Sequence, residues 1–211
     1  MSDPAPVWFV AGDHPDAVAL AARLGASRLL HLDDLGDLGD LGGLVATDSV
    51  VEDRPSAVVL CTWPSSVPAT RAVDIDDDAF RRAVEGPLGR WILALAQLAR
   101  WCDDDGSVVV VVERPTGLDT PGRLAHTVLA EGLVAYARSL AHAEGARGVR
   151  VNTVTTALHT TPDVLLGQRP PLPTFPGRVD VEVAGAVRML LGSDACGITG
   201  TMLHADCGRS W

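Results

Sequence analysis

Residues 106–112 read G-S-V-V-V-V-V, and this stretch sets the fold class of the 211-residue chain. Its valines form a continuous apolar run that does not alternate with polar residues. Such a run is typical of a strand that is buried on both faces, as in the middle of a parallel sheet with helices on either side. We therefore predict that this stretch is a central strand.

Short β-rich runs alternate with longer alanine- and leucine-rich segments on both sides of this strand. The alternation is the layout of βαβ units and predicts an α/β fold, a doubly wound parallel sheet covered by helices on both faces. We expect one domain over residues 1–211. The predicted strands are residues 7–11, 28–32, 57–61, 107–112, 149–154 and 201–204, and the predicted helices are residues 16–24, 77–101, 123–144 and 181–191.

Local signals define where two of these helices begin. The first opens with H-P-D, in which Asp13 is predicted to cap the free amides and Pro15 to sit in the first turn. Gly86 and Pro87 interrupt the segment 77–101. Because proline cannot donate a backbone hydrogen bond, this segment is predicted to start as a short separate turn or to be kinked.

Composition excludes several classes of protein. The chain is 47% hydrophobic and 21% charged, so it has enough apolar residues for a sizeable core. Its formal charge of -10 argues against nucleic acids and anionic membranes as partners. The cysteines are widely spaced and predict neither a zinc site nor a disulfide framework. No apolar run reaches the roughly 20 residues of a membrane span, and we expect a cytoplasmic protein.

Two predicted helices, residues 77–101 and 123–144, are apolar around nearly their whole circumference. A helix that lies on a sheet needs only one apolar stripe, so the opposite face of each needs its own cover. We expect that cover to be another subunit. A different segment, the D-L-G repeat at residues 33–43, has carboxylates and glycines but no calcium-loop spacing, and we interpret it as a solvated connection. We predict no metal site.

Three stretches resemble a known family when taken in order. Residues 130–141 read A-E-G-L-V-A-Y-A-R-S-L-A, residues 149–162 read V-R-V-N-T-V-T-T-A-L-H-T-T-P, and residues 198–208 read I-T-G-T-M-L-H-A-D-C-G. Together they resemble the second half of a short-chain dehydrogenase/reductase. The resemblance implies a Rossmann-like sheet, a nicotinamide cofactor, and a Ser-Tyr-Lys set that transfers a proton to or from the substrate.

The residues that this family uses for proton transfer are replaced here. The resemblance places His126 at the tyrosine position, Ala130 at the lysine position and Glu113 at the serine position. The supporting asparagine falls near Gly86. Alanine cannot supply the charge that makes a phenolate accessible at neutral pH, because the free phenol has a pKa of about 10. Tyr136 lies on a different face of the helix, so redox activity is predicted to be lost.

The cofactor motifs are also degraded. Where the family has a glycine-rich turn, residues 11–18 read A-G-D-H-P-D-A-V, and only Gly12 is retained. Asp13 and Asp16 would set carboxylates against a dianionic pyrophosphate. Bulky Trp63 stands where small residues border the nicotinamide cleft. About 50 residues separate the first strand from Cys61, too few for two further units at about 30 residues per βαβ unit, so the nucleotide-binding half is predicted to be shortened. We expect no bound cofactor.

Three functional hypotheses are compatible with these residues. The first is a non-catalytic subunit that pairs with itself or with an active homologous reductase through helices 77–101 and 123–144. The second is a non-redox enzyme that acts on a small or acyl/polyketide-type substrate, in which His126 and Glu113 form an acid–base pair. There Arg114 would hold an anionic group and Trp63 would wall off an apolar one. The third is an NAD(P)H-dependent ketoreductase with divergent motifs.

A plainer interpretation applies to each of these residues taken singly. Glu113 and Arg114 then solvate the end of a strand, and His126 is a surface residue in the first turn of a helix. For any one of the three we favour this interpretation.

Overall fold

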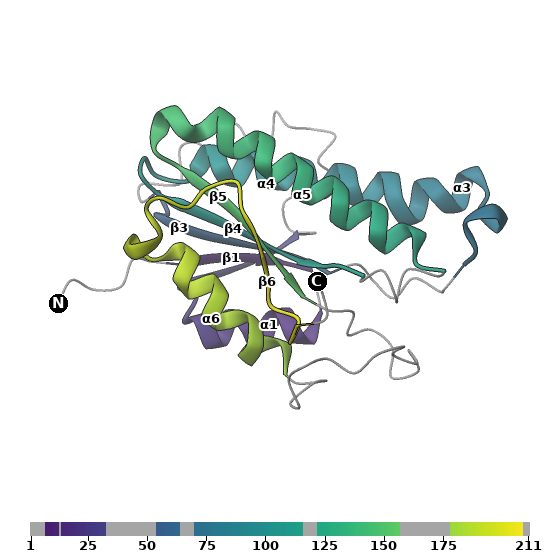
Figure 1. The fold of residues 1–211 in the computed structure, drawn as a ribbon, viewed down its shortest axis with the longest axis horizontal. Coiled ribbons are helices and arrows are strands. Elements are labelled where there is room, and N and C mark those ends of the chain that lie inside the picture. Colours follow the sequence, from purple (N-terminus) through teal and green to yellow (C-terminus); the bar gives the residue numbers. More distant parts are fainter. Residues whose placement is uncertain are drawn as a thin grey trace.

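The computed structural model of the protein describes residues 7–12, 14–32, 54–63, 70–115, 122–156 and 178–208. They contain a six-stranded sheet of order β2-β1-β3-β4-β5-β6 in which every neighbouring pair is parallel (Figure 1). The doubly wound α/β class is thereby confirmed, and so are the predicted strands. The strands are β1 (Val7–Ala11), β2 (Arg28–His31), β3 (Ala57–Thr62), β4 (Ser107–Glu113), β5 (Arg150–Thr156) and β6 (Met202–His204).

The strand order places a topological switch point between β1 and β3. The chain leaves β1 toward β2 on one side, and β3 then pairs with the other side of β1. Open α/β sheets bind ligands at the carboxyl ends of strands next to such a point. Among the described residues, β2 is the only strand beyond β1 on that side. Residues 33–53, which connect β2 toward β3, lie outside the described residues, so the shortening of the nucleotide-binding half stays a prediction.

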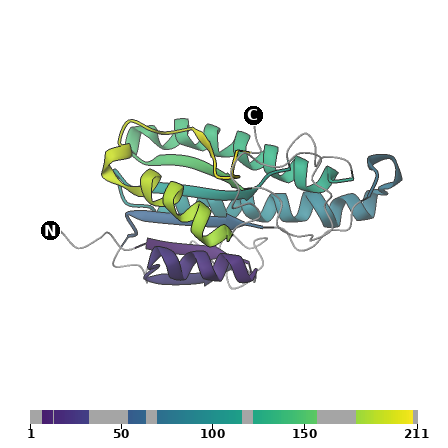
Figure 2. The ribbon, with the colours of Figure 1, turned by 60° about the horizontal axis from the view of Figure 1, so that its bottom comes forward.

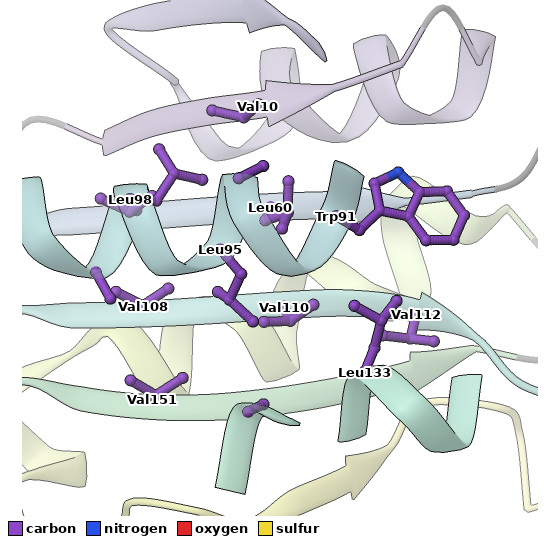
Figure 3. Packing of buried hydrophobic residues seen from close by; sticks show 14 of the residues in the cluster. Val10, Leu60, Trp91, Leu95, Leu98, Val108, Val110, Val112, Leu133 and Val151 are labelled. Carbon is purple, nitrogen blue, oxygen red and sulfur yellow. The ribbon is translucent and has the colours of Figure 1, made fainter. Parts of the chain in front are cut away.

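Two helical layers cover the sheet (Figure 2). One layer consists of α1 (Pro15–Leu24) and α6 (Val179–Leu191), and the other of α4 (Gly86–Trp101) and α5 (Leu124–Glu144). The valine run of β4 contributes to both cores, because alternate residues face opposite layers. Val109 and Val111 pack with α1 and α6, whereas Val108, Val110 and Val112 pack with α4 and α5. Figure 3 shows the second set beneath α4 and α5.

The burial of this run is complete, since no valine in it is more than 2% exposed. The predicted central strand is therefore confirmed. None of the described helices is long and apolar enough to cross a membrane.

The start of α1 differs from the prediction in its capping residue. Pro15 is the first helical residue, as expected, but the N-cap is His14, whose Nδ1 accepts a hydrogen bond from the backbone N–H of Asp16 at 3.3 Å. An imidazole nitrogen can accept such a bond in the way that a carboxylate does. Asp13 lies outside the described residues.

The interruption at Gly86 and Pro87 takes the form of a π-helical turn. A short helix, α3 (Asp77–Phe80), leads into the π turn Arg81–Glu85, and α4 continues from there. The backbone N–H of Gly86 bonds to the carbonyl of Arg81, five residues back. Pro87 has no N–H and its ring would crowd the carbonyl four residues back, so the wider turn relieves that clash. In Figure 1, α3 projects past the end of the sheet.

Helices α4 and α5 cover part of each other. An added Cβ at Gly132 on α5 would lie 3.2 Å from Leu88 Cδ1 on α4, so the two helices are in close contact at this glycine. The large hydrophobic side chains that are strongly exposed in the described residues lie elsewhere, at Val18, Leu29, Val73, Val181, Met189 and Ile198. The apolar pattern of both helices predicts that another subunit covers their second faces. The structure shows that the chain itself provides a share of that cover.

Candidate functional site

Three polar side chains lie together where β3, β4 and β5 end. The register pairs Thr62 of β3 with Val112 of β4. Trp63 directly follows Thr62, and Glu113 directly follows Val112. Glu113 is in turn paired with Thr156 at the end of β5. All three are buried. Trp63, Glu113 and Thr156 therefore stand at neighbouring strand ends along the carboxyl edge of the sheet, next to the switch point.

His126 reaches this edge from α5. It is the third residue of the helix and lies on the same stripe as Leu129, Ala130 and Leu133, which face the sheet. Its Nε2 lies 3.9 Å from Oε2 of Glu113, and each of the two side chains is 1% exposed. At this separation the pair is a close contact and not a hydrogen bond.

The structure thus brings together two of the predicted candidates, His126 and Glu113. The interpretation of each as a solvent-exposed residue is wrong. Its error has a clear cause: position 126 continues the apolar stripe of α5, so packing of that stripe on the sheet turns the imidazole toward the end of β4.

The imidazole is uncharged at neutral pH. Burial, followed by the nearby positive charge of Arg123, lowers the pKa of His126 from 6.5 to about 4. Its Nε2 has no hydrogen-bond partner among the described residues. The pair therefore consists of a neutral ring beside a carboxyl group, in a part of the molecule from which water is excluded.

Arg114 follows Glu113 but is directed elsewhere. Its guanidinium pairs with Glu131 of α5 at 2.7 Å, and its backbone N–H donates to the carbonyl of Thr156. The side chain thus joins the end of β4 to α5. Arg114 was predicted to hold an anionic group of a substrate. In the structure its guanidinium is instead engaged by the carboxylate of Glu131.

The position one turn beyond His126 holds Ala130, which is 1% exposed. No shift of the alignment can provide a lysine in its place, because all 17 basic residues of the chain are arginines. This signal was present in the sequence and was missed. The sole tyrosine, Tyr136, lies ten residues beyond His126 on α5, which is about 15 Å along the helix axis.

Two aromatic rings meet across the switch point. The ring of His14 lies edge-on to that of Trp63, with centroids 5.2 Å apart and planes at 61°. His14 is not among the predicted site residues. Pro15 was predicted to lie in the first turn of α1, and this placed His14 at the end of the helix that faces the switch point. Trp63 is 8% exposed, and its Nε1 is buried without a hydrogen-bond partner among the described residues.

The first turn of α1 does not fit the pyrophosphate of a dinucleotide. Such groups bind to free backbone amides at a helix N-terminus. Here the amide of Asp16 bonds to His14, and the Asp16 carboxylate lies 3.9 Å from the same imidazole nitrogen. Among the described residues, no group of three His, Cys, Asp or Glu side chains could hold a metal ion.

Sequence comparisons relate the chain to a family of reductases. A family model described as enoyl-(acyl carrier protein) reductase matches residues 16–210. An uncharacterized short-chain type dehydrogenase/reductase from Sinorhizobium fredii is 28% identical over 220 residues, which cover 94% of this chain and 38% of that protein. The chain therefore spans well under half of this relative's length.

Solved structures share the fold. A short-chain dehydrogenase/reductase from Serratia marcescens matches with a TM-score of 0.70 at 21% identity, over 98% of both chains. A 4-hydroxyisoleucine dehydrogenase complexed with NADH matches with a TM-score of 0.74 at 16% identity, over 97% of this chain and 98% of that one. A blue fluorescent protein from a metagenomic library, in complex with NADPH, gives 0.70 at 19% identity, over 98% of both. At these identities the likeness is one of fold.

The buried imidazole makes the stability of the protein depend on pH. The unfolded state binds a proton at His126 below pH 6.5, whereas the folded state resists it down to about pH 4. Stability is therefore lost as the pH falls through this window, by up to about 3 kcal/mol from this residue. We expect His126→Gln to flatten the pH dependence of urea unfolding between these values. His142→Gln, at an exposed histidine of the same helix, is the control and should leave it unchanged.

Proposed function

The chain belongs to the short-chain dehydrogenase/reductase family, whose members are typically oxidoreductases, and we propose that this member is a non-catalytic subunit of the cytoplasm that does not transfer hydride. The observation that carries the proposal is the occupancy of two buried positions one turn apart on α5. They hold an imidazole and a methyl group, His126 and Ala130. By resemblance, a redox-active member needs a phenol and an ammonium group there.

The replacement removes the means of proton transfer. Reduction of a carbonyl requires a group that gives up a proton and is stabilised after losing it. His126 is neutral at pH 7, since its pKa is about 4, and a neutral imidazole does not readily give up its remaining proton to a substrate. Glu113, at the serine position, places a carboxyl group where a hydroxyl would orient the substrate carbonyl.

The cofactor side supports the same proposal. In an open α/β sheet a dinucleotide crosses the switch point, with its pyrophosphate at the first helix. In this chain His14 and Trp63 are in ring contact at that point, and Asp16 adds a carboxylate to the first turn of α1. The two solved relatives named with NADH and NADPH share the fold. We infer that this chain does not bind either nucleotide productively.

A role as a subunit is supported by the outer layer of α4 and α5. The two helices lie side by side on one face of the sheet (Figures 1 and 2). Leu93 on α4 is half-buried but does not belong to the core cluster, and Ala135 on α5 is exposed. Both belong to the faces directed away from the core. We propose that a second copy, or an active homologous reductase, packs on this layer.

The curated relative is compatible with such a partner. More than half of its length lies outside the part that matches this chain. In that protein the matching part is therefore joined to a longer stretch of additional polypeptide.

Calorimetric titration with NADH and NADPH tests the loss of cofactor binding. We expect no heat of binding in the micromolar range for either nucleotide, because rings and a carboxylate stand where the pyrophosphate would lie. An intact reductase of the same family, titrated under identical conditions, serves as the positive control. Micromolar binding to this chain would instead support the third hypothesis, a divergent NAD(P)H-dependent ketoreductase.

Light scattering coupled to size-exclusion chromatography tests the assembly. We expect the wild-type chain to elute with the mass of a dimer, and the double variant Leu93→Arg/Ala135→Arg to elute as a monomer, because buried like charges would face each other across the interface. Ala143→Arg, at an exposed position in the last turn of α5, is the matched control. A wild-type monomer would argue against self-pairing, and mixing it with an active homologous reductase would then test the other partner.

A second candidate function is acid–base catalysis without a nicotinamide. The observation that favours it is the 3.9 Å separation of His126 Nε2 and Glu113 Oε2 in a dry environment. It ranks lower because both side chains are sealed from solvent and the imidazole stays neutral over the physiological range. Turnover of an acyl substrate in the absence of nucleotide, abolished by His126→Ala, would establish this function and would contradict a purely structural role.

A further inference from the structure

Two arginines of one short connection hold the ends of helices that lie on opposite faces of the sheet (Figure 2). Helix α5 leads through the 3-10 turn Gly145–Arg147 into β5, which begins at Arg150. Arg147 contacts the end of α4, and Arg150 contacts the end of α6. The connection lies where the strands begin, at the edge of the sheet opposite to His126 and Glu113. It is therefore separate from the candidate site.

Arg150 closes the carboxyl end of α6. The last four carbonyl groups of a helix have no partner within it and need donors from elsewhere. The guanidinium of Arg150 donates to four carbonyl oxygens in this region, those of Leu190 (2.7 Å), Ala195 (3.1 Å), Gly192 (3.3 Å) and Leu191 (3.4 Å). Among the described residues it pairs with no carboxylate. Its positive charge therefore serves the negative end of the α6 dipole and the turn that follows it.

Arg147 closes the carboxyl end of α4 in the same way. Its Nη1 donates to the carbonyl oxygen of Ala99 at 3.1 Å, and its Nη2 donates to that of Cys102, the residue that follows the helix. Two carboxylates hold this guanidinium in place, those of Asp104 and Glu144, each at 2.9 Å. One side chain therefore joins the end of α4, the turn after it and the last residue of α5.

The backbone between the two arginines is packed against the turn that joins α4 to β4. Gly148 lies between them at a φ of +72°, and a Cβ there would clash with the carboxylate of Asp105 in that turn, so glycine is required on both counts. The backbone N–H of Asp105 donates to the carbonyl of Arg147. That of Arg150 donates to the carbonyl of Gly106. Neither arginine can move far without disturbing the same turn.

We propose that residues 147–150 form a double latch, a conformational device that couples the helical layers on the two faces of the sheet. Native proteins open locally in cooperative units, and the double latch makes the ends of α4 and α6 one such unit. A guanidinium is required at each position because its planar fork presents several donors in fixed directions, whereas an ammonium group is a point charge. Any contact that holds α4 in place, a partner subunit included, then also protects α6. The coupling does not depend on the proposed loss of hydride transfer.

Hydrogen exchange of backbone amides in the native protein tests the coupling. Arg150→Lys keeps the positive charge but leaves too few donors for the end of α6. We expect amides in the last turn of α6 to exchange roughly tenfold faster, as for a lost hydrogen bond to a charged group. Amides in the last turn of α4 should accelerate by a similar factor, although none of the hydrogen bonds of the Arg150 guanidinium reaches α4. Arg147→Lys should have the reciprocal effect on α6.

Two further variants keep the test decisive. Asp104→Asn, at an exposed carboxylate, weakens the hold on Arg147 without altering the core and should accelerate exchange at both helix ends by a smaller factor. Arg138→Lys, at an exposed arginine of α5, is the matched control and should leave both ends unchanged. Acceleration confined to α6 in Arg150→Lys and to α4 in Arg147→Lys would overturn the proposal, because the two arginines would then be independent caps. Equal acceleration of the amides of β4 would also overturn it, since the opening would then be global.

Discussion

The structure depends on the burial of β4 on both of its faces. A strand made of valines has no side that can face water, so it requires a helical layer above and below it. One layer consists of α4 and α5, and the other of α1 and α6. They determine from which face of the sheet each helix approaches its carboxyl edge. Glu113 is the last residue of this strand and is enclosed for the same reason. The chemistry of the site is thus set by where the apolar run ends.

The same architecture explains why small and aromatic residues suit the positions around the carboxyl edge of the sheet. Packing of α5 requires small or apolar residues along its sheet-facing stripe, and Ala130 meets that requirement better than a lysine would. Likewise, ring contact between His14 and Trp63 fills space at the switch point. The residues at these positions therefore contribute to the packing of the helices on the sheet. The stability of the fold comes largely from the two hydrophobic cores.

The sequence predicts the fold better than the site. The valine run, the alternation of runs and the position of Pro15 each specify local structure, and the six strands follow from them. The cap of α1 was assigned to Asp13 because carboxylates are common caps, whereas His14 takes that place. The burial of His126 depends on how α5 is rotated against the end of β4, a property of the whole helix and sheet that one position does not encode. The absence of lysine, by contrast, can be read directly from the sequence.

The absence of lysine has consequences for the whole surface of the protein as well as for the candidate site. Across these 211 residues every fixed positive charge is a guanidinium, a planar group that does not lose its proton and does not act as a nucleophile under physiological conditions. No side chain of the chain can form an imine with an aldehyde, accept an acetyl group on nitrogen or carry an isopeptide-linked modifier. Lysine-based regulation, common on other protein surfaces, has no point of attachment here.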